Sequence, residues 1–81
     1  MLQPPQSADQ ILDARGLSCP MPLLKTKLAL QQLNAGQILQ VLASDSGSNR
    51  DIPAYLAQTS HCLLDQQEIS GDFYFVIQKA E

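Results

Sequence analysis

The sequence has few of the features that mark membrane, disulfide-rich or metal-binding proteins. Its 81 residues include no tryptophan, and its aromatic side chains are two Phe and two Tyr. The two cysteines, Cys19 and Cys62, are too few for a disulfide framework and do not form a C-x-x-C pair. No apolar run approaches the roughly 20 residues needed to cross a bilayer. Residues 1–7 hold neither a basic cluster nor an apolar segment, so we expect no secretory signal. These absences favour a cytoplasmic protein in a reducing compartment, with no membrane partner.

Positive charge is also scarce. The chain has five Lys and Arg residues against eight Asp and Glu residues, and its net charge is −3. Because non-specific nucleic-acid binding depends on neutralising phosphates, we expect no direct nucleic-acid partner. The sequence has no glycine-rich phosphate loop and no paired catalytic carboxylates, so we expect no cofactor. His61 and Cys62 are adjacent in a predicted strand and would point to opposite faces, which argues against a shared metal ion.

Hydrophobic periodicity and turn residues predict six secondary-structure elements. Residues 1–9, rich in Gln, Pro and Ser, are expected to form a flexible tail, and residues 10–81 a single domain. The pattern predicts strands over 10–14, 37–43, 61–68 and 73–77, a helix over 20–34, and a second helix that starts near Asp51 with Pro53 in its first turn. The order βαβαββ predicts an α/β (α+β) two-layer sandwich, in which two helices cover one face of a four-stranded mixed sheet.

The first predicted helix carries more apolar surface than one sheet can bury. Its core face would hold the residues Leu23, Thr26, Leu30 and Leu33. Met21, Leu24 and Leu28 form a second apolar stripe on nearly the opposite side. This stripe is either ordinary exposed surface or a partner-docking surface, with Lys25 and Lys27 beside it. In the second helix the inner face would hold Ile52, Tyr55, Leu56 and Thr59.

The segment Cys19-Pro20-Met21-Pro22 precedes the first helix directly. Because a residue before proline is pushed out of the α region, Cys19 is expected at the N-cap, with Pro20 as the first helical residue. The helix dipole there would lower the pKa of the thiol and make it a nucleophile. Cys62, within a predicted strand, is expected to be buried and inert. Asp51 is expected to cap the second helix.

Residues Leu12-Asp13-Ala14-Arg15-Gly16-Leu17-Ser18-Cys19-Pro20-Met21-Pro22, followed by Arg50-Asp51-Ile52-Pro53, resemble the TusA/SirA-like sulfur-carrier family. The resemblance covers the chain from Leu12 to its end. It implies that Cys19 carries sulfur as a persulfide, supported by Pro20, Pro22 and the Gly16 loop. The sulfur would come from a cysteine desulfurase and pass to an acceptor protein, in the best-known branch toward 2-thiouridine in tRNA. Such a chain is a shuttle rather than a stand-alone catalyst, and we expect it to be a monomer when free.

Two other functions fit the residues. In one, the chain is a regulatory or interaction module in which the Cys-Pro-Met-Pro segment only caps a helix. In the other it is a thiol redox protein that uses Cys19 and Cys62, which requires their Cα atoms to lie within about 7 Å. Asp45, Arg50 and Asp51 are expected to face a partner in the carrier interpretation.

Overall fold

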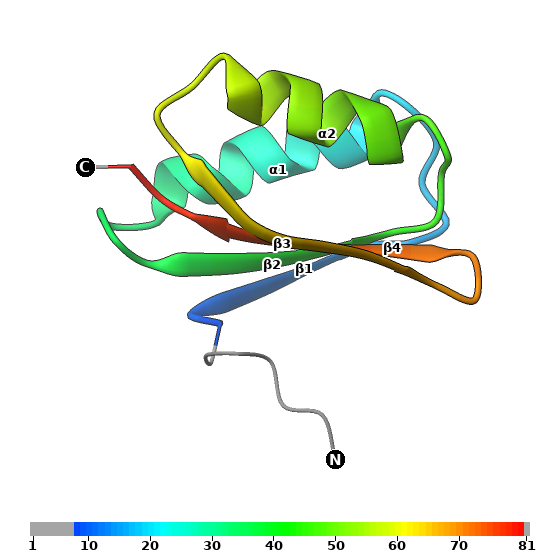
Figure 1. Cartoon of the computed structure of the whole chain (residues 1–81), viewed down its shortest axis with the longest axis horizontal. Coiled ribbons are helices and arrows are strands. Elements are labelled where there is room, and N and C mark those ends of the chain that lie inside the picture. The colour runs from blue at the N-terminus through cyan, green and yellow to red at the C-terminus, as the bar shows by residue number, and fades with distance from the viewer. Residues whose placement is uncertain (1–7, 81) are drawn as a thin grey trace.

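The computed structural model describes residues 8–80. Its elements follow the order β1 (Gln10–Ala14), α1 (Met21–Gln32), β2 (Ile38–Ala43), α2 (Ser48–Ala57), β3 (Cys62–Ile69) and β4 (Asp72–Gln78). Both helices lie on one face of a four-stranded sheet and begin at the same end of the molecule (Figure 1). The predicted two-layer α+β architecture is confirmed.

The sheet has the strand order β1-β2-β4-β3, with β1 parallel to β2 and the other two pairs antiparallel. The last strand in the sequence therefore lies between two strands made earlier. Its side chains explain this central position, because Phe75 and Ile77 are fully buried. They pair with Val41 and Leu39 of β2, which are also fully buried, as the apolar alternation predicts.

The face of helix α1 that the sequence predicts to be buried packs against the core. Thr26 and Leu30 are buried, and the Thr26 hydroxyl donates to the Pro22 carbonyl oxygen at 2.8 Å. Leu23 and Leu33 are partly buried against the same core. The second apolar stripe faces solvent: Met21, Leu24 and Leu28 are 42%, 43% and 58% exposed.

Helix α2 differs from its prediction at the start. It begins at Ser48 rather than near Asp51, so Pro53 lies inside the helix rather than in its first turn. Asp51 is a first-turn residue and Gly47 occupies the N-cap position. The earlier start follows from a tight turn over residues 45–47, in which the Ser48 amide donates to the Asp45 carbonyl oxygen at 3.0 Å.

Proline inside α2 leaves one carbonyl oxygen without its usual helical donor. Pro53 has no N–H, so the Asn49 carbonyl oxygen loses the bond that a residue four positions later would supply. Gln66 of β3 donates to that oxygen at 3.3 Å and to the Asn49 side-chain oxygen at 2.9 Å. The strand thus replaces the bond that the helix cannot make, and the early start of α2 is compatible with Pro53.

The described ends of the chain are tied to the centre of the fold. Asp9 and Ile38 exchange two hydrogen bonds, of 2.8 Å from the Asp9 amide and 2.7 Å to its carboxylate. The Lys79 amide donates to the Gln37 carbonyl oxygen at 2.9 Å. Of the tail expected over residues 1–9, residues 1–7 lie outside the described residues. Within 8–80 no helix is both long and apolar enough to cross a membrane.

Candidate functional site

The site forms where two loops meet at the end of the molecule at which both helices begin. One loop follows β1 and contains Gly16, whose φ of 82° is in the left-handed region that favours glycine. The other loop follows β2. The Gly16 amide donates to the Ser44 hydroxyl oxygen at 2.9 Å and joins the two loops. Because β1 and β2 are parallel, both loops leave the same edge of the sheet.

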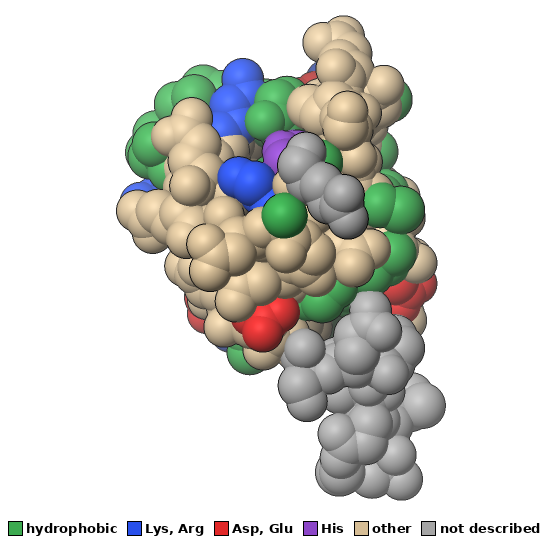
Figure 2. Space-filling view, turned by 90° about the vertical axis from the view of Figure 1, so that its left-hand side faces the viewer, with side chains coloured by type: hydrophobic (Ala, Val, Ile, Leu, Met, Phe, Trp, Pro, Cys, Tyr) green, Lys and Arg blue, Asp and Glu red, His purple; other side chains and the backbone are tan. Residues whose placement is uncertain are grey.

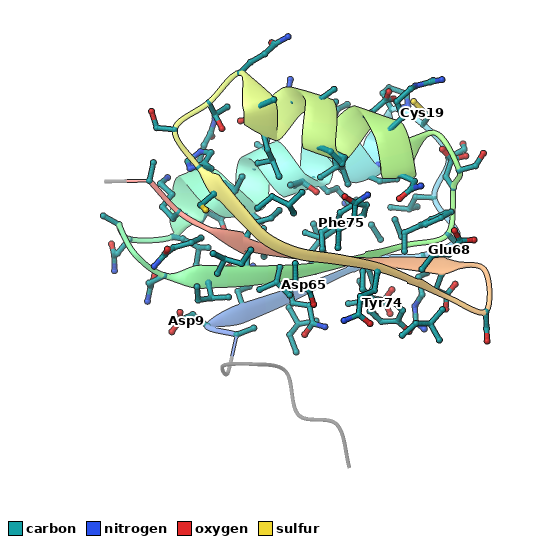
Figure 3. All side chains as sticks on the ribbon, viewed as in Figure 1. Asp9, Cys19, Asp65, Glu68, Tyr74 and Phe75 are labelled. Carbon is teal, nitrogen blue, oxygen red and sulfur yellow. The ribbon has the colours of Figure 1, made fainter. Side chains whose placement is uncertain are left out.

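Cys19 lies at the end of the first loop, outside helix α1. Met21 is the first helical residue, Pro20 is the N-cap, and Pro22 is buried in the first turn. The prediction that Cys19 is the N-cap and Pro20 the first helical residue is therefore wrong by one position. The Cys19–Pro20 peptide bond is cis. In Figure 3 the Cys19 side chain lies beside the start of α2.

The Cys19 thiol makes a side-chain hydrogen bond to α2. Its Sγ donates to Oδ2 of Asp51 at 3.1 Å, across 32 positions of sequence. The other carboxylate oxygen of Asp51 accepts a long contact of 3.5 Å from the Arg50 guanidinium. Asp51 is thus held between a thiol and a cation. The sequence shows both motifs but not that the fold brings them into contact.

Asp51 changes the electrostatics of the cysteine. The hydrogen bond to Asp51 raises the pKa of the Cys19 thiol above its ordinary value, and desolvation with the charges of Asp51 and Asp45 adds to the rise. Arg50 lowers it, with less effect. The prediction of a lowered pKa is wrong because the sulfur faces carboxylates rather than the unpaired N–H groups of α1.

Gly47 allows the second loop to approach the cysteine closely. Its amide donates to Oδ2 of Asp45 at 3.0 Å. A Cβ atom on Gly47 would lie 2.9 Å from that oxygen, 3.5 Å from Cys19 Cβ and 3.7 Å from Cys19 Sγ. Gly47 is a site residue that the sequence patterns did not predict. The signal available was a glycine just before a helix, which is not specific.

Cys62 does not meet Cys19. Its predicted burial is wrong: both cysteines are exposed and free. Cys62 opens the edge strand β3, where fewer side chains reach the core, and lines a shallow apolar groove of about 310 Å³ with Ala57 and other residues near the end of α2. Cys19 instead contacts the first turn of this helix, through Asp51.

The end of the molecule where the helices finish has a different surface. Figure 2 views it from that side and shows basic side chains, drawn in blue, beside the histidine. The His61 ring accepts a hydrogen bond at Nδ1 from the Ala80 amide at 2.9 Å. Desolvation, and secondarily the charge of Lys79, lowers the pKa of His61. Among the described residues, no group of three or more His, Cys, Asp or Glu side chains is arranged to hold a metal ion.

The remaining predicted site residues lie along α1. Met21 is two residues beyond Cys19, and Leu24 and Leu28 continue the exposed stripe away from it. Lys25 and Leu28 line a shallow hollow of about 180 Å³ between α1 and β1. The Lys27 ammonium lies 4.8 Å from the centre of the Tyr55 ring, so this lysine faces α2 rather than the stripe. The fold therefore gathers Cys19, Met21 and the Asp45–Asp51 region, while Leu28 and Lys27 are farther along α1.

Known proteins share both the sequence and the architecture of this chain. Residues 10–79 match the family described as Sulfurtransferase TusA. The sulfur carrier protein TusA of Allochromatium vinosum is 44% identical over 72 residues, which is 89% of this chain and 95% of that protein. The sulfur carrier protein TusA of Pseudomonas putida is 44% identical over 71 residues, covering 88% of this chain and 89% of that protein.

A solved structure shares the fold. The crystal structure of a SirA-like protein from Desulfitobacterium hafniense superposes with a TM-score of 0.76 and covers 89% of this chain and 99% of that one, at 24% identity. The chain is thus a small α+β protein that shares its fold with that SirA-like protein. The chain belongs to the TusA family of sulfur carriers.

Proposed function

We propose that this protein is a cytoplasmic carrier that takes sulfane sulfur onto Cys19 as a persulfide and passes it to an acceptor protein. The donor is a cysteine desulfurase, and the end product of the relay is 2-thiouridine in tRNA. The observation that carries the proposal is the exposed thiol of Cys19 at a surface formed by two loops and two helix starts. The chemistry needs such a thiol, because the sulfur must be reachable by two different partners.

The transfer is a thiol exchange between two sulfur atoms. The Cys19 thiolate attacks the terminal sulfur of the donor's cysteine persulfide, and a new S–S bond forms on Cys19. The S–S bond of the donor breaks, and its cysteine leaves as a thiolate that takes up the proton lost from Cys19. No net oxidation occurs. The same exchange, with an acceptor thiol or acceptor site as the attacking group, then releases the sulfur from Cys19.

Partners would dock on the surface around Cys19. The apolar stripe of Met21, Leu24 and Leu28 begins two residues from the cysteine and remains in solvent. Apolar side chains at the centre of a contact carry most of its binding energy. Lys25 on the β1 side, and Lys27, Asp45, Arg50 and Asp51 on the α2 side, would set the charge complementarity and the association rate.

The position of Cys62 argues against a redox function. A Cys19–Cys62 disulfide requires Cα atoms within about 7 Å, whereas helix α2 lies between the two cysteines. The relay instead needs one thiol with no neighbour that could displace the sulfur as a disulfide. An interaction module that does not use the thiol remains the competing function, and it predicts that Cys19→Ser has no functional effect.

Sulfur loading tests the proposal directly. The protein would be incubated with a cysteine desulfurase and ³⁵S-labelled cysteine, and the bound sulfur would be located by peptide mass mapping. We expect one added sulfur on the Cys19 peptide, loss of loading in Cys19→Ser, and normal loading in the matched control Cys62→Ser. Label on Cys62 alone, or no loading of the folded protein, would contradict the proposal.

A further inference from the structure

The geometry points to Asp51 as a positioning residue that holds the Cys19 thiol in its protonated form in the unloaded carrier, so that sulfur acceptance requires this contact to break. This inference rests on the proposed persulfide chemistry of Cys19. It assigns to the Arg50-Asp51-Ile52-Pro53 segment a role toward the thiol itself, in addition to the partner contact proposed above.

The carboxylate is well placed to hold the proton. Asp51 Oδ2 is 3.1 Å from Cys19 Sγ. The Asp51 backbone is fixed in the first turn of α2, where its amide donates to the Gly47 carbonyl oxygen at 2.8 Å. The Asp51 side chain is 29% exposed, whereas that of Arg50 is 83% exposed. The carboxylate is therefore more rigidly held than the cation beside it.

The two carboxylates near the sulfur act in the same direction as the hydrogen bond, and one guanidinium opposes them. The charged groups that influence Cys19 are the carboxylates of Asp51 and Asp45 and the more weakly acting guanidinium of Arg50. All three belong to α2 and to the loop before it. A thiolate on Cys19 would face two carboxylates at short range, and one exposed cation only partly offsets them. The unloaded carrier thus keeps its sulfur in the less nucleophilic form until a partner arrives.

Sulfur loading removes the donor of this hydrogen bond. In the transfer step the Sγ proton leaves with the donor's cysteine, and Sγ forms an S–S bond to the transferred sulfur. Sγ of the persulfide then carries no hydrogen and cannot donate to Asp51. The Cys19–Asp51 contact therefore marks the unloaded state. A partner with a cationic group near Asp51 would compete for the carboxylate and free the thiol while it docks.

The test compares the reactivity of Cys19 in variants that change one carboxylate. All proteins carry Cys62→Ser, so that only one thiol reacts, and alkylation by iodoacetamide is followed from pH 6 to 10. Asp51→Asn keeps the size and an oxygen acceptor but removes the charge. We expect its alkylation midpoint to fall, and its rate at pH 7 to rise roughly threefold or more, because the thiolate fraction at pH 7 grows as the pKa of the thiol falls.

Two further variants separate a local effect from net charge and from packing. Glu68→Gln removes an exposed carboxylate on β3 and should leave the midpoint unchanged. Asp51→Glu keeps the charge and should keep a high midpoint. An unchanged midpoint in Asp51→Asn, or an equal fall in Glu68→Gln, would overturn the inference. Sulfur loading of all proteins is measured in parallel. An unchanged midpoint in Asp51→Asn with normal loading rejects only this inference. Loss of loading in every protein, the Cys62→Ser parent included, rejects the proposed function even if the midpoint of Asp51→Asn falls.

A second measurement needs no substitution at Asp51. Methyl methanethiosulfonate converts Sγ–H of Cys19 into an S–S–CH₃ group, which lacks the proton as a persulfide does. In the Cys62→Ser protein we expect amide NMR signals of residues 45–51 to move on this modification, with no change at Glu68. Signals of 45–51 that stay in place would show that the contact with Asp51 does not respond to loss of the proton, and would overturn the inference even if Asp51→Asn fails to fold.

Discussion

Gly47 determines how closely the second loop approaches the cysteine. A side chain there would meet Asp45 Oδ2 at 2.9 Å and the two outer atoms of Cys19 at 3.5 and 3.7 Å. Asp45 cannot turn away freely, since its carboxylate accepts the Gly47 amide. The room around the sulfur is therefore a local property of this loop and is separate from the stability of the core.

We expect Gly47→Ala to slow alkylation and sulfur loading of Cys19 while changing the free energy of unfolding by less than about 1 kcal/mol, as is usual for surface positions. The matched control is Ser46→Ala, an exposed neighbour. Rates would be measured with iodoacetamide and stability by urea unfolding. Equal rates in Gly47→Ala and the parent protein would mean that the loop moves without cost and that Gly47 does not shape the site.

The ion pair of Asp13 and Arg15 joins the end of β1 to the loop that leads to the cysteine. Both side-chain nitrogens Nε and Nη2 of Arg15 lie 2.9 Å from the Asp13 carboxylate, and the Arg15 amide lies 3.1 Å from it. These hydrogen bonds hold the pKa of Asp13 at about 2. A depressed carboxyl pKa contributes stability above the ordinary value, and this contribution is lost as the pH falls toward 2.

We expect an NMR titration of Asp13 to give a pKa of about 2, and Arg15→Gln to return it toward about 3.9, the ordinary value of an aspartate. The difference in stability between the parent and Arg15→Gln should shrink as the pH is lowered from 4 to 2. A pKa of Asp13 near its ordinary value in the parent protein would contradict the bidentate geometry.

At the scale of elements, α1 has a buried face and an exposed apolar face. Substitutions on the exposed face should weaken partner binding and leave folding nearly unchanged. We expect Leu24→Gln and Leu28→Gln to weaken desulfurase binding about tenfold, the effect of losing about 1.4 kcal/mol at a contact centre. The thermal transition should stay nearly unchanged, since both side chains are at least 43% exposed.

Ile69→Gln is the control for loss of an exposed apolar side chain, because Ile69 is 51% exposed on β3, outside the stripe. Leu30→Ala is the control for loss of core, and should cost about 2–5 kcal/mol at a side chain that is 1% exposed. Normal desulfurase binding by both stripe variants would show that partners reach Cys19 from the side of the 45–51 loop instead.

Helix α2 and strand β3 are joined by a hydrogen bond at a carbonyl oxygen that Pro53 leaves free. Gln66 donates to the carbonyl oxygen of Asn49, which Pro53 leaves without a helical donor. We expect Gln66→Ala to cost about 0.5–1.5 kcal/mol, the usual net contribution of one hydrogen bond. The cost should be smaller in a Pro53→Ala background, where residue 53 regains an N–H.

A double-mutant cycle by urea unfolding measures this coupling. A positive coupling energy supports the exchange of one donor for the other. Additive effects of the two substitutions would mean that the contact between Gln66 and Asn49 contributes little. The start of α2 is hard to predict from sequence because Pro53 suggests a first-turn position. Only the structure shows that Gln66 of β3 supplies the hydrogen bond that Pro53 cannot make.

The sequence predicts the features that depend on local interactions and misses those that depend on contacts between distant residues. Element order and the exposed stripe of α1 depend on local periodicity, and the structure confirms them. The Cys19–Asp51 hydrogen bond joins residues 32 positions apart and depends on tertiary geometry. The direction of the thiol pKa follows from that contact, so sequence reasoning reversed its sign.

At the scale of the whole molecule, the core depends on the strand that comes last. Phe75 is fully buried in a core cluster that also contains residues of β2, α1 and α2. We expect Phe75→Ala to cost about 3–5 kcal/mol, a large part of the 5–15 kcal/mol that holds a typical folded protein together. Urea unfolding would measure it, with Tyr74→Ala, on the opposite and half-buried face of the same strand, as the smaller-effect comparison. Equal costs at the two positions would contradict the assignment of the core face.

The central place of β4 also limits when the chain can fold during synthesis. Strand β2 has β1 on one side, but its other side stays unpaired until β4 has been made. Strand β3 pairs with β4 alone, so it has no partner at all before that moment. At roughly 5–20 residues per second, about two to seven seconds pass between the end of β2 and the end of β4, and the free edge of β2 stays open during that time. Ribosome-associated factors that shield unfinished sheets are therefore expected to bind this chain until its last strand emerges.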